Sequence, residues 1–79
     1  MQRDILIQFG KKLRELRKRN NLTQVELSKR AGFDRNYIGM LERGERNPAL
    51  LNIQKIAQVF NITLSEFFKD IENNDGKNK

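Results

Sequence analysis

Two side chains suited to reading nucleic-acid bases stand next to each other in the middle of the chain. Arg35 and Asn36 carry a guanidinium and an amide, and each group can make two hydrogen bonds to one base edge. Arginine pairs in this way with O6 and N7 of guanine, and asparagine with N6 and N7 of adenine. On a helical wheel they share one arc of about 140° with Gly39, Met40 and Arg43. This outward face therefore predicts recognition of bases in the major groove.

Gly39 lies in the middle of that face and has two interpretations. A glycine inside a helix is unfavourable by about 1 kcal/mol relative to alanine, so its presence can reflect close approach of the helix to DNA. It can equally be a glycine that a surface position tolerates. Both interpretations stay open from the sequence.

Residues at the edges of the same face are suited to phosphate. Gln24 begins the preceding helix, whose first N–H groups also favour an anion, and Arg43 ends the following helix. Arg46 and Asn47 follow in the next loop. Tyr37 sits at the boundary of the face, so either its ring packs in the core or its hydroxyl contacts phosphate or a base.

Two short helices connected by a sharp turn must position these groups, and residues 23–44 have the pattern of such a unit. Thr23 and Glu26 have the spacing of a capping box, which starts a helix. Gly32 stands where the chain must turn with positive φ, and Asp34 is a good N-cap for the next helix. We therefore expect a helix-turn-helix, which places its second helix in the major groove of DNA.

Apolar periodicity predicts three more helices and an all-α, compact five-helix domain over residues 1–72. The five expected helices cover approximately residues 3–20, 23–31, 35–43, 49–60 and 63–72. In the fourth, the stripe facing the core comprises Leu50, Ile53, Ile56, Ala57 and Phe60. Residues 73–79 are polar, and we expect a disordered tail there.

The positive charge is concentrated on the segment that contains the helix-turn-helix. The whole chain has 79 residues and a net charge of +6. Residues 11–46 hold 11 Lys or Arg against 5 Asp or Glu, whereas residues 47–79 hold 4 against 4. A basic segment that coincides with the predicted reading face is expected for a protein that binds polyphosphate.

The composition argues against catalysis and against a membrane span. The chain contains no His and no Cys, and it has neither a Gly-rich phosphate loop nor a metal-ligand cluster, so we expect no enzyme, cofactor or metal. No apolar run approaches the roughly 18 residues of a membrane helix, and there is no signal-peptide core. We expect a cytoplasmic protein without a small-molecule ligand.

Residues 9–68 contain six short motifs: Leu22-Thr23-Gln24, Ala31-Gly32, Tyr37-Ile38, Glu42-Arg43-Gly44, Asn47-Pro48 and Leu64-Ser65-Glu66-Phe67. With these motifs the chain resembles the lambda-repressor-like (Cro-type, xenobiotic-response-element) helix-turn-helix family. Within it, residues 34–38, 42–43 and 46–47 look most like the controller proteins of restriction–modification systems, which are small dimers that regulate their own operon.

The resemblance implies a sequence-specific regulator of transcription that binds double-stranded DNA, with RNA polymerase as a further candidate partner. It implies base contacts from Arg35, Asn36 and Met40, and an ion pair between Arg17 and Glu42 that joins the first helix to the recognition helix. It also implies phosphate contacts from Gln24, Arg43 and Asn47. An antitoxin or a phage-type repressor, whose domain also binds a protein partner, remains the alternative.

Four apolar residues that would form an exposed patch on a monomer predict a homodimer that binds a two-fold symmetric operator. Two of them lie off the core stripe of the fourth helix, and the other two lie near the chain end, where they have little left to cover. A single helix-turn-helix contacts few base pairs, so specificity requires two half-sites about one helical turn apart. The candidate interface consists of Leu51, Val59, Phe68 and Ile71. Alternatively, Phe68 and Ile71 fold back onto the first helix and cover Ile5 and Leu6.

Overall fold

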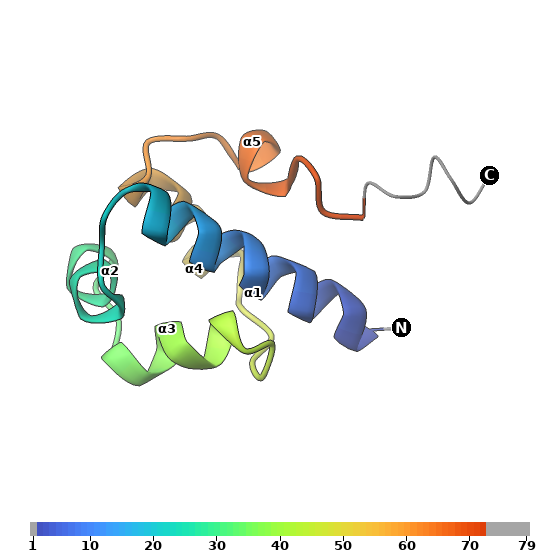
Figure 1. Ribbon diagram of the computed structural model, residues 1–79, viewed down its shortest axis with the longest axis horizontal. Helices are drawn as coiled ribbons and strands as arrows, with labels where there is room; N and C mark the ends of the chain where they lie inside the picture. Colours follow the sequence, from blue (N-terminus) through green and yellow to red (C-terminus); the bar gives the residue numbers. More distant parts are fainter. Residues whose placement is uncertain (1, 73–79) are drawn as a thin grey trace.

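The computed structural model describes residues 2–72, which fold into five α-helices without a strand among them. The helices are α1 (Gln2–Arg19), α2 (Gln24–Ala31), α3 (Arg35–Glu42), α4 (Leu50–Val59) and α5 (Leu64–Phe68). α1 crosses the molecule between α3 and α5, and α2 and α3 form the helix-turn-helix (Figure 1). The predicted all-α class is confirmed, and the predicted tail at 73–79 lies outside the described residues.

The helix starts follow from the capping residues seen in the sequence. The Thr23 hydroxyl accepts the N–H of Glu26, and the Glu26 carboxylate accepts the N–H of Thr23 in return. Thr63 and Glu66 make the same reciprocal pair at the start of α5. These contacts satisfy backbone donors that a helix start otherwise leaves unpaired. The Thr23 hydrogen bonds hold the pKa of the Glu26 carboxyl below its ordinary value.

Four helices are followed, within two residues of their ends, by a residue with positive φ, which lets the chain leave at a sharp angle. These residues are Asn21 (φ 58°), Gly32 (φ 82°), Gly44 (φ 76°) and Asn61 (φ 59°). In the turn between α2 and α3 the Phe33 N–H then donates to the Ser28 carbonyl over 2.8 Å. Because this geometry fixes the exit direction, the angle between α2 and α3 is set locally.

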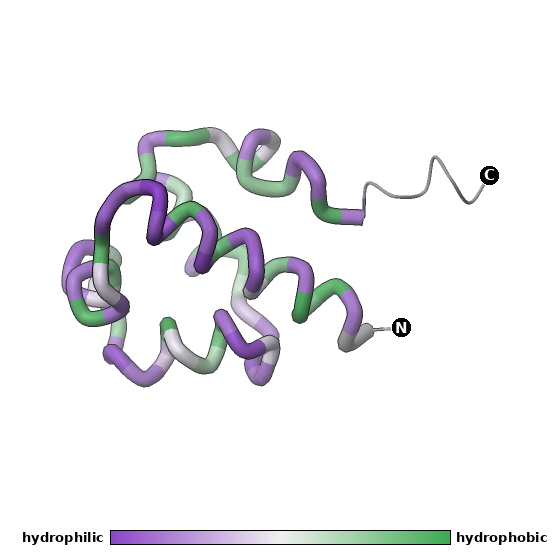
Figure 2. Tube along the Cα trace, in the orientation of Figure 1, coloured by the Kyte–Doolittle hydropathy of each residue, from purple (hydrophilic) through white to green (hydrophobic). Residues whose placement is uncertain are grey.

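Apolar side chains from all five helices form one core. Along the helices, apolar and polar residues alternate, as the green and purple segments of the tube in Figure 2 show. The Phe9 and Phe67 rings stack with centroids 5.1 Å apart and so join α1 to α5. The buried apolar residues are Phe9, Leu13, Leu16, Leu22, Leu27, Ile38, Leu41, Ile53, Ile56, Ala57, Phe60 and Phe67.

A glycine in α1 allows the backbones of α1 and α3 to come into contact. A Cβ atom at Gly10 would lie 2.5 Å from the carbonyl oxygens of both Leu41 and Glu42, at the end of α3. Such a distance is shorter than van der Waals contact, so only glycine fits at this crossing. The apolar pattern of α1 did not identify this position, because the pattern contains no information about what the helix crosses.

Two expectations about the C-terminal half are wrong. α5 ends at Phe68 rather than near residue 72, because the chain then turns back along α1: Asp70 has a φ of 68°, and the Glu72 N–H donates to Oε1 of Gln8 over 2.6 Å. Leu50, expected on the core stripe of α4, is 69% exposed. It is the first residue of α4, and the buried stripe of this helix begins one turn later, at Ile53.

Candidate nucleic-acid interface

The outward face of α3 gathers most of the predicted contact residues. Arg35 and Asn36 are exposed in its first turn, where the Asp34 side chain accepts the N–H of Asn36 and caps the helix. Arg35, Asn36, Gly39 and Arg43 line one depression together with Gln24 and Val25 of α2. Donors from both helices therefore converge on the same surface. Val25, which is 38% exposed there, was missed by the sequence analysis.

Met40 lies apart from that depression. Its half-buried side chain lines a second hollow beside Tyr37, Arg46 and Asn52. The wheel arc predicted from the sequence therefore divides into two neighbouring parts. Arg35, Asn36 and Arg43 form one part, and Met40 with the loop residue Arg46 forms the other. Asn47 is exposed in the same loop.

Tyr37 has contacts with three other side chains. Its hydroxyl accepts a hydrogen bond from Nδ2 of Asn52 over 3.0 Å, and its ring meets the edge of Phe33 with centroids 5.0 Å apart. The Arg46 guanidinium lies 5.3 Å from the centre of the Tyr37 ring, within the range of a cation–π contact. Tyr37 thus ties α4 to α3 and holds Arg46 near the recognition helix. No sequence pattern had identified Asn52.

Gly39 is covered by protein rather than open on the surface. It is buried, and a Cβ atom there would lie 3.2 Å from Nη1 of Arg43 and 3.5 Å from Oε1 of Gln24. The missing side chain therefore makes room for Gln24 and Arg43 to lie across α3. Neither sequence-based interpretation included this contact, because a helical wheel does not show side chains from a neighbouring helix.

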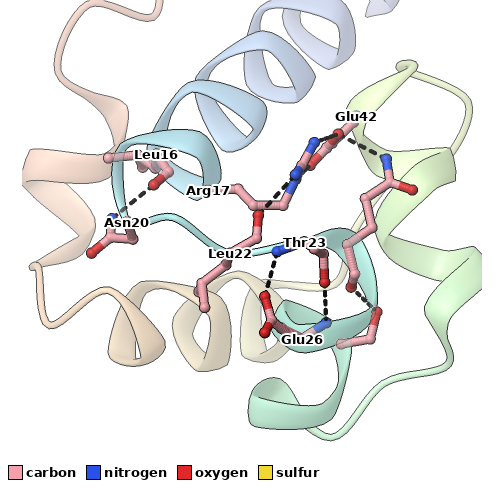
Figure 3. A network of polar contacts seen from close by, with 9 residues as sticks. Leu16, Arg17, Asn20, Leu22, Thr23, Glu26 and Glu42 are labelled. Carbon is pink, nitrogen blue, oxygen red and sulfur yellow. Dashed lines mark hydrogen bonds and ion pairs between the residues drawn. The ribbon is translucent and has the colours of Figure 1, made fainter.

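A network of hydrogen bonds centred on the Glu42 carboxylate holds the recognition helix in place (Figure 3). Arg17 donates from Nε to Oε2 of Glu42 over 2.6 Å and from Nη2 to Oε1 over 3.1 Å. Gln24 donates from Nε2 to the same Oε1 over 3.0 Å, and Arg17 also donates to the Leu22 carbonyl over 2.9 Å.

The ion pair implied by the family resemblance is thus present in the structure, and it is largely buried. The side chains of Arg17 and Glu42 are 12% and 4% exposed. Both charges are satisfied by several hydrogen bonds, which is the condition under which a buried pair is tolerated. Because Gln24 is bonded to Glu42, the network also fixes the side chain that begins α2.

An exposed ion pair lies at the end of the recognition helix. Arg43 donates from Nε to Oε2 of Glu45 over 2.9 Å and from Nη2 to Oε1 over 3.2 Å. These hydrogen bonds raise the pKa of Arg43 and lower the pKa of Glu45. Glu45 was not predicted as a site residue, although its spacing of two residues from Arg43 is visible in the sequence.

The sequence profile of the helix-turn-helix family matches residues 13–67, a span that includes the turn, both of its helices and their supporting core. The chain belongs to the helix-turn-helix family. The matched residues contain Gln24, Arg35, Asn36 and Arg43, which the structure places in one depression.

Individual relatives of this helix-turn-helix protein include control proteins. The control protein C.MunI from a Mycoplasma species is 46% identical over 70 residues, which span 87% of this chain and 95% of that protein. The control protein C.BamHI from Bacillus amyloliquefaciens is 36% identical over 63 residues, or 78% of each chain. The crystal structure of the restriction-modification controller protein C.AhdI from Aeromonas hydrophila matches with a TM-score of 0.78 and 46% identity, covering 80% of this chain and 96% of that one.

The described residues contain neither a metal-ligand cluster nor a membrane-spanning helix. Within residues 2–72, no cluster of three or more carboxylate, imidazole or thiol side chains is arranged to hold a metal ion. The helices in this part of the chain are also too short or too polar to span a bilayer.

Proposed function

We propose that this helix-turn-helix protein is the controller of a restriction–modification system, and that it regulates transcription by binding a specific DNA sequence. The observation that carries sequence-specific DNA binding is the exposed pair Arg35 and Asn36 in the first turn of α3. The similarity to the control protein C.MunI and to the controller protein C.AhdI supports the controller assignment. Arg35 and Asn36 are assigned to base edges, as is Met40 in the neighbouring hollow. Gln24, Arg43, Arg46 and Asn47 are assigned to phosphates, and Tyr37 supports Arg46.

The proposal includes a homodimer, because one recognition helix reads too few base pairs to define a site. Leu51 is 67% exposed and Leu50 beside it is 69% exposed, so the start of α4 presents an apolar surface. Val59, Phe68 and Ile71 are only partly buried against the core. The Phe68 ring also packs against the Phe9 ring, with the two ring centroids 6.1 Å apart. Phe68 therefore belongs to the monomer core as well as to the proposed interface.

A selection of bound sequences from a pool of random duplexes tests the specific function. We expect a two-fold symmetric site whose halves lie about one helical turn apart. Recovery of unrelated sequences would contradict specific recognition. A toxin that co-purifies in stoichiometric amounts would instead favour an antitoxin.

The mode of action in this proposal is binding to DNA without catalysis, in the cytoplasm. Transcription in vitro from a promoter that carries the selected site distinguishes activation from repression. Activation would add RNA polymerase as a direct partner, whereas repression requires only occupancy of the promoter.

A further inference from the structure

We propose that Glu45 weakens sequence-independent DNA binding, because its carboxylate competes with DNA phosphates for the Arg43 guanidinium. The inference rests on the proposed function, in which Arg43 contacts phosphate. It assigns a role to an acidic residue at the edge of a surface that otherwise attracts an anion.

The Glu45 carboxylate occupies one complete edge of the Arg43 guanidinium. The two hydrogen bonds to Glu45 use Nε and Nη2 of Arg43, at 2.9 and 3.2 Å. The remaining nitrogen, Nη1, lies against Gly39 on the recognition helix. A phosphate that approaches Arg43 must therefore displace the carboxylate or share the guanidinium with it. Both outcomes weaken the contact.

The turn after α3 holds the two side chains close together. Gly44, between them, has a φ of 76°, and the Glu45 N–H donates to the Met40 carbonyl over 2.9 Å. A Cβ atom at Gly44 would lie 3.0 Å from Cγ1 of Ile7, so this turn is packed against α1. Because the backbone is fixed on both sides, the pair requires little ordering of the chain when it forms.

Glu45 is the exposed carboxylate that a phosphate approaching Arg43 meets. Residues 34–48 contain three carboxylates: Asp34, which is exposed at the start of α3, Glu42 and Glu45. Glu42 is 4% exposed on its side chain and bonded to Arg17, whereas the Glu45 side chain is 49% exposed. Glu45 therefore opposes the attraction of DNA by Arg35, Arg43 and Arg46 on this surface.

The expected size of the effect follows from the exposure of the pair. Exposed ion pairs change an equilibrium constant by about two- to fivefold, so Glu45→Gln should strengthen binding to an unrelated duplex by about that factor. In the variant, Arg43 contacts phosphate without competition from a carboxylate. The slope of log K against log salt concentration should therefore become steeper, by less than the about 0.9 that one whole phosphate contact contributes.

The experiment measures fluorescence anisotropy with a labelled duplex of unrelated sequence, about three helical turns long, across a salt series. The variants are Glu45→Gln, Arg43→Gln and the two combined. Glu15→Gln is the matched control, because Glu15 pairs with Arg19 at 2.8 Å with comparable exposure and its loss changes the net charge equally. Circular dichroism confirms that each variant folds.

The proposal expects Glu45→Gln to bind more tightly and with a steeper slope than Glu15→Gln. Once Arg43 is replaced, Glu45→Gln should give no gain beyond that of Glu15→Gln. Equal effects of the two Glu→Gln variants would overturn it, because the gain would then reflect net charge alone. Weaker binding by Glu45→Gln would also overturn it, because the carboxylate would then orient Arg43 for DNA. If the wild type binds neither this duplex nor a selected site, the proposed function itself fails.

Discussion

The buried pair between Arg17 and Glu42 predicts a large loss of stability when either charge is removed alone. Arg17→Met would leave the Glu42 carboxylate, 4% exposed, with Gln24 as its remaining side-chain partner. Glu42→Gln would leave the Arg17 guanidinium, 12% exposed, without a counter-charge. Breaking a buried pair in this way destabilises a protein by about 3–5 kcal/mol. That is a large part of the roughly 5–15 kcal/mol that stabilises a typical domain.

A double-mutant cycle measured by urea unfolding isolates the interaction itself. The combined variant removes both charges, so it should be less destabilised than the sum of the two single variants. We expect a coupling free energy of about 2–3 kcal/mol. A change of about 3 kcal/mol corresponds to roughly 12–24 °C in Tm for a domain of this size, so thermal melting gives an independent readout.

The pair between Arg19 and Glu15 is the matched control. Its nitrogen–oxygen distance of 2.8 Å is close to the 2.6 Å of the buried pair, but its side chains are 62% and 58% exposed. An exposed helical pair of this kind contributes about 0.3–0.5 kcal/mol. A coupling between Arg17 and Glu42 as small as that of the control would refute the reasoning from burial.

Four further predictions concern DNA binding, packing, assembly and pH. Arg35→Ala should weaken binding to the DNA site obtained by selection by about 1–3 kcal/mol and relax the preference at one base pair. Arg43→Ala should instead weaken binding to all sequences and reduce the slope of log K against log salt concentration by about 1. Gly10→Ala should destabilise the fold by at least about 2 kcal/mol in urea unfolding, because its Cβ would lie 2.5 Å from backbone oxygens of α3. Leu51→Ser should shift the proposed homodimer toward monomer in sedimentation equilibrium at tens of micromolar protein, because it replaces an apolar residue that is 67% exposed. Glu26 has a pKa lowered from 4.5, so it stabilises the fold above that pH and this contribution is lost as the pH falls through the lowered value. The difference in stability between the wild type and Glu26→Gln should therefore shrink on acidification.

Each of these predictions has an outcome that contradicts it. A uniform loss of affinity for Arg35→Ala would make Arg35 a phosphate contact, and an unchanged salt slope for Arg43→Ala would remove its assignment to phosphate. Wild-type stability of Gly10→Ala would contradict the close crossing of α1 and α3. A wild type that stays monomeric at the same concentration, yet binds a two-fold symmetric site, would reject a preformed dimer. For Glu26, a difference that is independent of pH would show that its carboxylate contributes nothing to the cap.

Most helix boundaries were predictable because they depend on neighbouring residues. Thr23 and Glu26 lie three positions apart and form the expected capping box. Gly32 and Asn61 have the positive φ expected of residues that end helices. The end of α5 was not predictable in this way. Residues 69–72 turn because of contacts with α1, which is distant in sequence.

The candidate site was predictable as a set of residues but not as an arrangement. Arg35, Asn36 and Arg43 share the expected face, whereas Met40 lies in a separate hollow. A helical wheel gives the direction of each side chain from its own axis. It contains no information about side chains that reach across from a second helix, and it therefore missed the contact of Gln24 with Gly39.

The sequence by itself determined the five helices, the identity of most core residues and the location of the positive charge, because each depends on local spacing or on composition. Only the tertiary structure decided which groups meet: the contact of Gly10 with the end of α3, the cover over Gly39 and the hydrogen bond of Asn52 to Tyr37. The physical reason is that these contacts depend on the distances and angles at which helices cross, and those are set by packing of the whole core.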